Sequence, residues 1–103
     1  MARECVARLA DLWDGEMRGY RVAGARVLLV RVGDDVHAYA DRCPHLGVPL
    51  SEGVLEDCVI TCRAHQFQFD AATGKGVNPR TAKLHPYPVT LADGEITVEI
   101  DEP

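Results

Sequence analysis

Two short stretches of the sequence each pair a cysteine with a histidine. One residue separates Cys43 from His45, two residues separate Cys62 from His65, and 16 residues lie between the two stretches. Thiolate sulfur and imidazole nitrogen are both good metal ligands. Within each pair the two side chains lie too far apart along a regular strand to bind one metal atom. We therefore expect both stretches to be loops.

The mixed composition of each pair favours a centre with two metal atoms. Each loop can offer its cysteine to one iron and its histidine to a second iron. Two cysteines on one iron and two histidines on the other are the ligands of a Rieske [2Fe–2S] cluster. The pattern therefore predicts that one such cluster is bound by Cys43, His45, Cys62 and His65.

A zinc site is the alternative, because two cysteines and two histidines also make a tetrahedral zinc centre. Structural zinc sites usually keep like ligands together, as C-x₂₋₄-C with H-x₃₋₅-H, whereas both pairs here are mixed. The spacing thus favours the iron–sulfur cluster. A zinc-stabilised interaction module without a redox role remains the alternative of another class.

The predicted centre indicates electron transfer rather than catalysis. A metal pair whose ligands all come from the protein has no open position for substrate, unlike a catalytic metal site. Ser51 lies in a long loop without a paired base, and the other polar residues suggest no nucleophile–base arrangement. We therefore expect a one-electron carrier, and no catalysis by this chain alone.

Composition and charge restrict the class of protein further. The chain has 103 residues, with 16 acidic and 11 basic side chains and a formal net charge of −5. This length fits one domain, and the acidic balance argues against a nucleic-acid partner. It is compatible with docking onto a basic protein surface, although it also serves solubility. With no long apolar run and no secretory signal pattern, we expect a cytoplasmic protein without membrane association.

The elements that must position the two loops are β-strands. Short β-branched runs separated by Gly, Asp and Pro favour an all-β fold. Strands are predicted over residues 5–9, 26–32, 36–39, 58–61, 67–69, 87–91 and 95–100. Asp93 and Gly94 predict a hairpin before the last strand. Residues 41–57 and 71–88 are rich in proline and glycine and are expected to be long loops without strands.

The two stretches, their separation and the β-rich surroundings resemble the Rieske family. Within it, residues 50–53, 59–65, 73–76, 78–79 and 87–89 are similar to the Rieske ferredoxins of multicomponent toluene and alkene monooxygenases. The resemblance implies an all-β Rieske fold of three antiparallel sheets, in one domain over residues 1–103. A cluster-binding tip of about residues 41–69 would be inserted in a larger β base of residues 1–40 and 70–103. Cys43 and Cys62 would bind the buried iron, and His45 and His65 the iron nearest solvent.

The same resemblance implies the partners. The donor would be an NADH-dependent reductase with flavin and iron–sulfur centres. The acceptor would be an oxygenase, first of all the diiron hydroxylase of an aromatic or alkene monooxygenase. The ferredoxin of an aromatic-ring dioxygenase is the alternative within the same chemistry. A Rieske-like domain without a cluster is disfavoured, because all four ligands are present. Nothing in the sequence suggests more than a monomer.

Some positions depart from other branches of the family. Val48 and Ala64 stand where the respiratory and photosynthetic Rieske proteins carry an extra disulfide. Phe67 and Phe69 stand where those proteins place hydroxyl groups beside the cluster, so we expect a low reduction potential. Cys58 is expected to be a small core residue on a strand. The rim around the exposed ligands is expected to comprise Pro44, Leu46, Gly47, Gln66 and Pro86.

Overall fold

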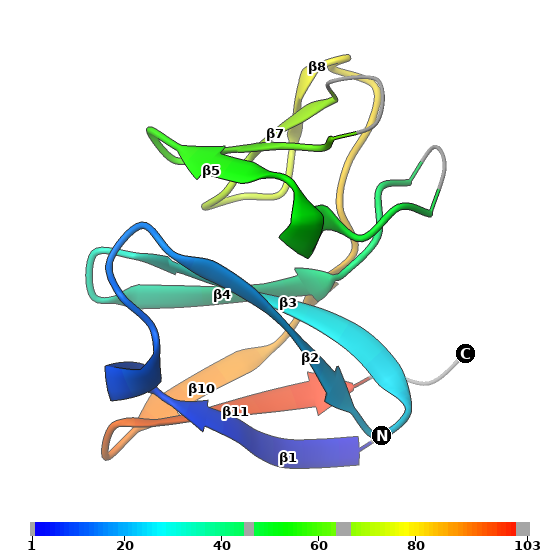
Figure 1. The fold of residues 1–103 in the computed structure, drawn as a ribbon. Helices are drawn as coiled ribbons and strands as arrows, with labels where there is room; N and C mark the ends of the chain where they lie inside the picture. The colour runs from blue at the N-terminus through cyan, green and yellow to red at the C-terminus, as the bar shows by residue number, and fades with distance from the viewer. Residues whose placement is uncertain (1, 45–46, 64–66, 101–103) are drawn as a thin grey trace.

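Strands make up more than half of the residues that the structure describes, and they form three antiparallel sheets (Figure 1). The computed structural model describes residues 2–44, 47–63 and 67–100. Its elements are β1 (Ala2–Arg8), η1 (Leu9–Asp11), β2 (Met17–Val22), β3 (Ala25–Val32), β4 (Asp35–Ala40), η2 (Leu50–Glu52), β5 (Val54–Glu56), β6 (Val59–Thr61), β7 (Gln68–Asp70), β8 (Gly76–Asn78), β9 (Pro86–Tyr87), β10 (Val89–Ala92) and β11 (Glu95–Ile100). The two η elements are short 3₁₀ turns. The all-β fold with three antiparallel sheets is confirmed.

The three sheets stack as layers. The base sheet has the order β1-β11-β10, the central sheet β2-β3-β4-β9, and the tip sheet β5-β6-β7-β8. Figure 1 shows the central sheet between the base sheet below and the tip sheet above. The chain crosses from the central sheet to the tip after β4 and returns through β9. Within the described ranges, no helix is long and apolar enough to cross a membrane.

β3 contributes buried side chains to two hydrophobic cores, one on each face of the central sheet. Its residues 27–30 are all buried, and side chains along a strand alternate between the two faces of the sheet. Val27 and Leu29 pack in the core shared with the base sheet, whereas Leu28 and Val30 pack in the core shared with the tip. A strand buried on both faces is continuously apolar rather than alternating. This accounts for the four consecutive apolar residues at positions 27–30.

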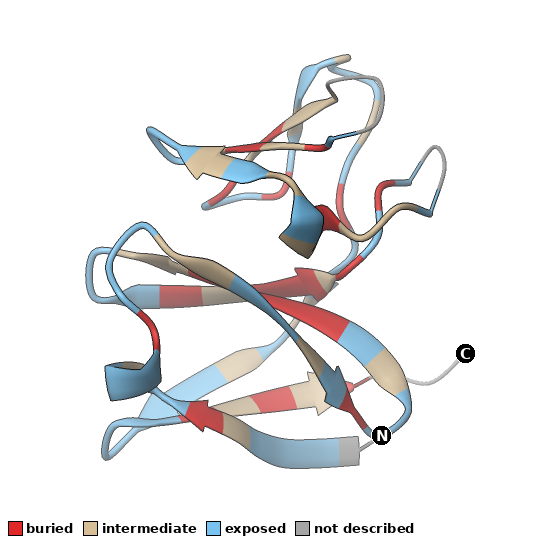
Figure 2. Cartoon of the chain, in the orientation of Figure 1, coloured by how far each residue is buried: buried red, intermediate tan, exposed pale blue. Residues whose placement is uncertain are grey.

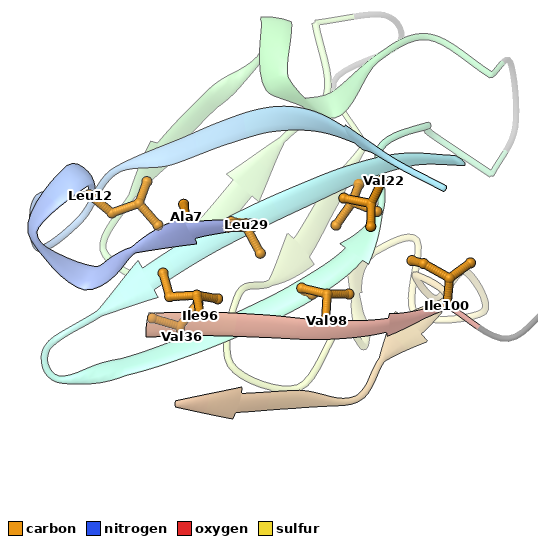
Figure 3. Close-up of a cluster of buried hydrophobic side chains, with 10 residues drawn as sticks. Ala7, Leu12, Val22, Leu29, Val36, Ile96, Val98 and Ile100 are labelled. Atoms are coloured by element: carbon orange, nitrogen blue, oxygen red, sulfur yellow. The ribbon is translucent and has the colours of Figure 1, made fainter. Parts of the chain in front are cut away.

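The base core lies between the central and base sheets (Figure 3). The base sheet contributes alternate residues of β11, namely Ile96, Val98 and Ile100, which are buried while their neighbours are partly or fully exposed. Figure 2 shows the same alternation of buried and less buried segments along β11. The period of two predicted for this strand is therefore confirmed, and its apolar face covers the central sheet.

The tip core lies on the opposite face of the central sheet. Its buried members are Leu28, Val30, Tyr39, Cys43, Leu50, Ile60, Cys62, Phe69, Ala71 and Leu84. This core joins the central sheet, the tip sheet and the two stretches that carry the predicted ligands. The cysteine-bearing stretches are thus packed against an apolar core and do not stand apart from the fold.

Three strands and one break were not predicted. β2 contains two arginines and a glycine, so its sequence lacks the apolar alternation of a strand. It forms a strand because six of its residues pair with residues of β3. β5 lies within residues 41–57, and β8 lies within residues 71–88, so the expectation of strand-free loops there was wrong. The predicted strand 87–91 is divided at Pro88. β9 pairs with β4 in the central sheet, whereas β10 pairs with β11 in the base sheet.

The prediction for Cys58 was also wrong. Cys58 is exposed, and it lies with Asp57 in the tight turn between β5 and β6, not on a strand in the core. Both residues have positive φ, 50° for Asp57 and 63° for Cys58, as a two-residue type I′ hairpin turn requires. The sequence signal was weak because this turn usually takes Asn-Gly or Asp-Gly, and a cysteine there is unusual.

Tyr39 ties the central sheet to the tip. Its ring is buried in the tip core, and its hydroxyl donates a 2.7 Å hydrogen bond to the carbonyl of Ala71, just after β7. Burial raises the pKa of Tyr39 to about 12, and the nearby Asp70 carboxylate raises it further in the same direction. The folded state therefore favours the neutral phenol.

This pKa predicts a loss of stability in alkali. An unfolded tyrosine titrates near pH 10, so below that pH both states keep the proton. Between about pH 10 and 12 the unfolded chain loses it while folded Tyr39 keeps it, which favours unfolding. The contribution of Tyr39 should fall by about 2–3 kcal/mol over this range. Denaturant unfolding of wild type and Tyr39→Phe at pH 9 and pH 12 measures it. Equal falls in both proteins would contradict the assignment.

Candidate metal centre

The two cysteines of the predicted centre begin two loops of the tip. Cys43 starts the loop that follows β4 and leads to η2, and Cys62 follows β6 directly. Both side chains are buried, with 1% and 0% exposure, and both belong to the tip core. Neither forms a disulfide. Two thiols from loops distant in sequence are therefore held in one apolar cluster.

The two loops close in the same way. The amide of Cys43 donates to the carbonyl of Val48 at 2.8 Å, and the amide of Cys62 donates to that of Phe67 at 2.7 Å. In each case the partner lies five residues after the cysteine. The first loop has a second bond, from the Gly47 amide to the Cys43 carbonyl at 2.7 Å. The two cysteines thus hold equivalent positions at the roots of two similar loops.

The other half of the predicted ligand set lies outside the described residues. These two ligands are His45 and His65. Leu46, Ala64 and Gln66, which were not predicted to be ligands, also lie outside the described residues. Within residues 2–44, 47–63 and 67–100 no group of three or more His, Cys, Asp or Glu side chains could hold a metal ion. Three predicted rim residues are described, and Pro44, Gly47 and Pro86 are all exposed.

The described donors fit one half of a [2Fe–2S] site. Thiolate sulfur is the soft ligand that iron–sulfur centres take, and here two thiols enter the same buried cluster from two loop roots. Leu50, Ile60 and Phe69 are fully buried in that cluster and keep water from this side of the thiols. An apolar shell of this kind controls solvent access and dielectric at a metal site.

Asp41 anchors the first loop. Its side chain is 5% exposed, and it is the buried charged residue of the described chain. Its two carboxylate oxygens accept bonds from the amide and the hydroxyl of Ser51, at 2.9 and 2.8 Å. A Cβ on Gly19 would come within 2.6 Å of Asp41 Oδ2, so β2 leaves room for this pair. The pair joins the chain just before Cys43 to η2.

Sequence reasoning missed this pair. Asp41 and Ser51 lie ten residues apart in a segment without periodicity, and neither residue type is unusual in a loop. The contact appears only because η2 folds back onto the end of β4. Ser51 was identified in the sequence as a hydroxyl without a base. Its observed role is structural, since its hydroxyl donates to Asp41.

Removing this hydroxyl should destabilise the tip. A hydrogen bond to a charged group contributes roughly 1.5–3 kcal/mol, so Ser51→Ala should lower the free energy of unfolding by about that amount. Thr81→Ala is the matched control, because Thr81 is exposed and should change stability by less than about 0.5 kcal/mol. Denaturant titration followed by far-UV circular dichroism gives both values. Equal losses in the two variants would contradict the anchoring role.

A surface ion pair also links the two loops. Arg63, next to Cys62, lies 3.3 Å from the carboxylate of Glu52 at the end of η2. Their side chains are 66% and 51% exposed, so solvent screens the pair and it contributes at most about 1 kcal/mol. The geometry of the loops therefore depends mainly on the buried core, the two closing backbone bonds and the Asp41–Ser51 pair.

Comparisons with known proteins agree with this geometry. A model of the Rieske [2Fe–2S] domain matches residues 2–88. The ferredoxin component of an alkene monooxygenase system from Xanthobacter autotrophicus is 42% identical over 94 residues, covering 90% of this chain and 77% of that protein. The ferredoxin of carbazole 1,9a-dioxygenase from Nocardioides aromaticivorans IC177 has a similar structure, with a TM-score of 0.85 and 32% identity over 95% of this chain and 97% of that one. A chain in a complex of reduced oxygenase and oxidized ferredoxin of carbazole 1,9a-dioxygenase gives a TM-score of 0.84 and 35% identity, covering 93% and 91%.

Proposed function

The chain belongs to the Rieske [2Fe–2S] domain family, and from that premise we propose that it carries single electrons from a reductase to an oxygenase. One Rieske-type cluster, when bound, supplies the one-electron redox change. The observation that carries the proposal is that the thiols of Cys43 and Cys62 are both buried in one core, outside any disulfide, at the roots of two similarly closed loops.

The ligand assignment is part of this proposal. Cys43 and Cys62 would hold the inner iron, because their side chains lie in the tip core. His45 and His65, from the same two loops, would complete the set on the outer iron. With all four ligands supplied by the chain, no coordination position stays open for substrate. The chain is therefore the electron-transfer component of a larger system and not its catalyst.

Our choice of electron acceptor rests on how similar this chain is to the ferredoxins of different oxygenase systems. The alkene monooxygenase ferredoxin is 42% identical to this chain, against 32% and 35% for the carbazole dioxygenase ferredoxins. We therefore favour the diiron hydroxylase of an aromatic or alkene monooxygenase over an aromatic-ring dioxygenase. The donor would be an NADH-dependent reductase with flavin and iron–sulfur centres. The protein would act in the cytoplasm as a monomer that meets its partners transiently.

Two measurements test the proposal. The purified protein should be red-brown, and after reduction with dithionite it should give the EPR spectrum of a Rieske centre. A colourless, EPR-silent protein that contains zinc would make it a structural module instead. When it is mixed with NADH and its cognate reductase and oxygenase, substrate should be hydroxylated only in its presence. Turnover that does not depend on this chain would contradict the carrier role.

The reduction potential should lie at the low end of the Rieske range, which runs from about −150 to +300 mV. Phe69 is fully buried and Phe67 is half-buried against the same core, and neither side chain has a hydroxyl to donate to the cluster sulfurs. Fewer such bonds stabilise the reduced form less. Phe69→Tyr should raise the potential if its hydroxyl reaches a sulfur. A wild-type value well above zero in a redox titration would contradict this prediction.

A further inference from the structure

Asp41 is a buried carboxylate at the neck of the first ligand loop. Its side chain is 5% exposed, although aspartate is rarely buried in proteins. It lies two residues before Cys43, and Ser51 lies in η2, beyond the other end of the same loop. The two bonds from Ser51, at 2.9 and 2.8 Å, therefore tie both ends of the loop to one carboxylate. We call the contact between Asp41 and Ser51 the loop neck.

The central sheet holds this carboxylate in place. The amide of Asp41 donates to the carbonyl of Arg26 on β3 at 3.0 Å. On β2, a Cβ at Gly19 would lie 2.6 Å from Asp41 Oδ2 and 2.9 Å from Ser51 Oγ, so only a glycine leaves room for both side chains. Two residues of backbone span at most about 7 Å. The position of the carboxylate is therefore fixed in the segment that leads directly into Cys43.

Hydrogen bonding alone does not explain why this side chain carries a charge. An asparagine in the same place could accept a bond from the Ser51 amide with Oδ1 and donate one to the Ser51 hydroxyl with Nδ2. It would close the same loop without the free-energy cost of removing a charge from water. The anchoring role therefore accounts for the shape and the polar atoms of Asp41, but not for its charge.

The charge does have a consequence for electron transfer. A one-electron reduction of the centre that Cys43 would hold adds one negative charge beside the loop neck. A fixed negative charge in the same place opposes that addition. Because Asp41 is buried, its field acts through a medium of low dielectric and is screened by salt much less than the field of a surface charge. Net charge is among the factors that set the potential of an iron–sulfur centre.

We infer that the carboxylate of Asp41 lowers the reduction potential of the centre bound by its own loop. This inference rests on the proposed function. Arg21, Arg26 and Arg42 line the cavity beside Asp41, but their side chains are exposed, so solvent screens their opposing effect. Asp41 thus has two roles, one that its hydrogen bonds perform and one that its charge performs.

Three variants separate these two roles. Asp41→Asn removes the charge and can keep both bonds to Ser51. Ser51→Ala keeps the charge and removes the bond from the hydroxyl. Glu52→Gln is the matched control, because it removes a carboxylate next to the loop neck whose side chain is 51% exposed. Each reconstituted holoprotein is titrated anaerobically with a redox dye, at low salt and near 1 M salt. Its visible and EPR spectra check that the cluster is intact.

Asp41→Asn should have a more positive reduction potential than wild type, and most of this difference should remain near 1 M salt. Any shift in Glu52→Gln should disappear there, because screening then acts within about 3 Å in solvent. Ser51→Ala should not raise the potential, since its carboxylate is still present. A looser loop that lets water reach the centre would instead raise the potential in Asp41→Asn and Ser51→Ala alike.

Two results would overturn the role of the charge while leaving the carrier function intact. One is an Asp41→Asn protein whose potential equals that of wild type, and the other is an equal rise in Ser51→Ala. Asp41→Ser is the second neutral variant if Asp41→Asn does not hold a cluster, because its smaller side chain fits the same space. Loss of the cluster from both neutral variants would assign Asp41 to anchoring alone. A wild-type protein without a Rieske EPR signal would overturn the proposed function and this inference together.

Discussion

Replacing Cys62 with serine is expected to give a colourless protein without the EPR signal of a Rieske centre and without measurable electron transfer. The thiol of Cys62 is fully buried in the tip core, which also contains Cys43. Serine has a similar size, but its hydroxyl is not the soft, readily ionised ligand that an iron–sulfur cluster takes. Cys43→Ser should have the same result, because one lost thiolate leaves the inner iron without half of its protein ligands.

The chain provides its own control for this experiment. Cys58→Ser and Cys5→Ser remove thiols that are exposed, the first in the β5–β6 turn and the second on β1. Both variants should keep the full visible spectrum and a normal iron content. Iron and acid-labile sulfide per chain, measured after anaerobic reconstitution of all four variants, provide the comparison. A red-brown Cys62→Ser protein, or cluster loss in Cys58→Ser, would contradict the ligand assignment.

Residue type and spacing were enough to predict the cofactor, whereas the contacts that support the two loops were not predictable. The pairing of Cys with His in two short stretches is rare and chemically specific. The structure places both cysteines at equivalent loop roots in one core. The two histidines lie outside the described residues, so their role as ligands stays a prediction. So does the division of the chain into a tip of residues 41–69 and a base.

The fold was predictable where a strand carries its own apolar pattern. β3 and β11 are such strands, one continuously apolar because it faces two cores and one alternating because it faces one. β5 and β8 are short, and their residues are partly or fully exposed, so no periodicity marks them. They become strands because they pair with β6 and β7. Contacts between distant segments also created the Asp41–Ser51 pair.

Gly53→Ala should be strongly destabilising, because η2, which follows the first ligand loop, meets the strand before Cys62 at this glycine. Gly53 follows η2 directly, with φ −89°, so an alanine would fit its backbone conformation. A Cβ there, however, would collide with the carbonyl oxygen of Thr61, the residue before Cys62. Backbone cannot move aside as a side-chain end can. Either η2 or the root of the second loop must shift, and we expect a loss of roughly 3 kcal/mol or more, with reduced cluster content.

Gly33→Ala separates this steric effect from the ordinary cost of replacing glycine. Gly33 lies in the β3–β4 turn with φ +64°, and nothing lies within 4 Å of an added Cβ. Gly33→Ala should lower the free energy of unfolding only by the cost of a left-handed backbone conformation, about 1–2 kcal/mol. It should leave the cluster intact. Denaturant unfolding and the visible absorbance of both holoproteins give the two losses. If Gly53→Ala is no less stable than Gly33→Ala and holds its full complement of iron, then η2 and β6 are not in the close contact that positions the two loops.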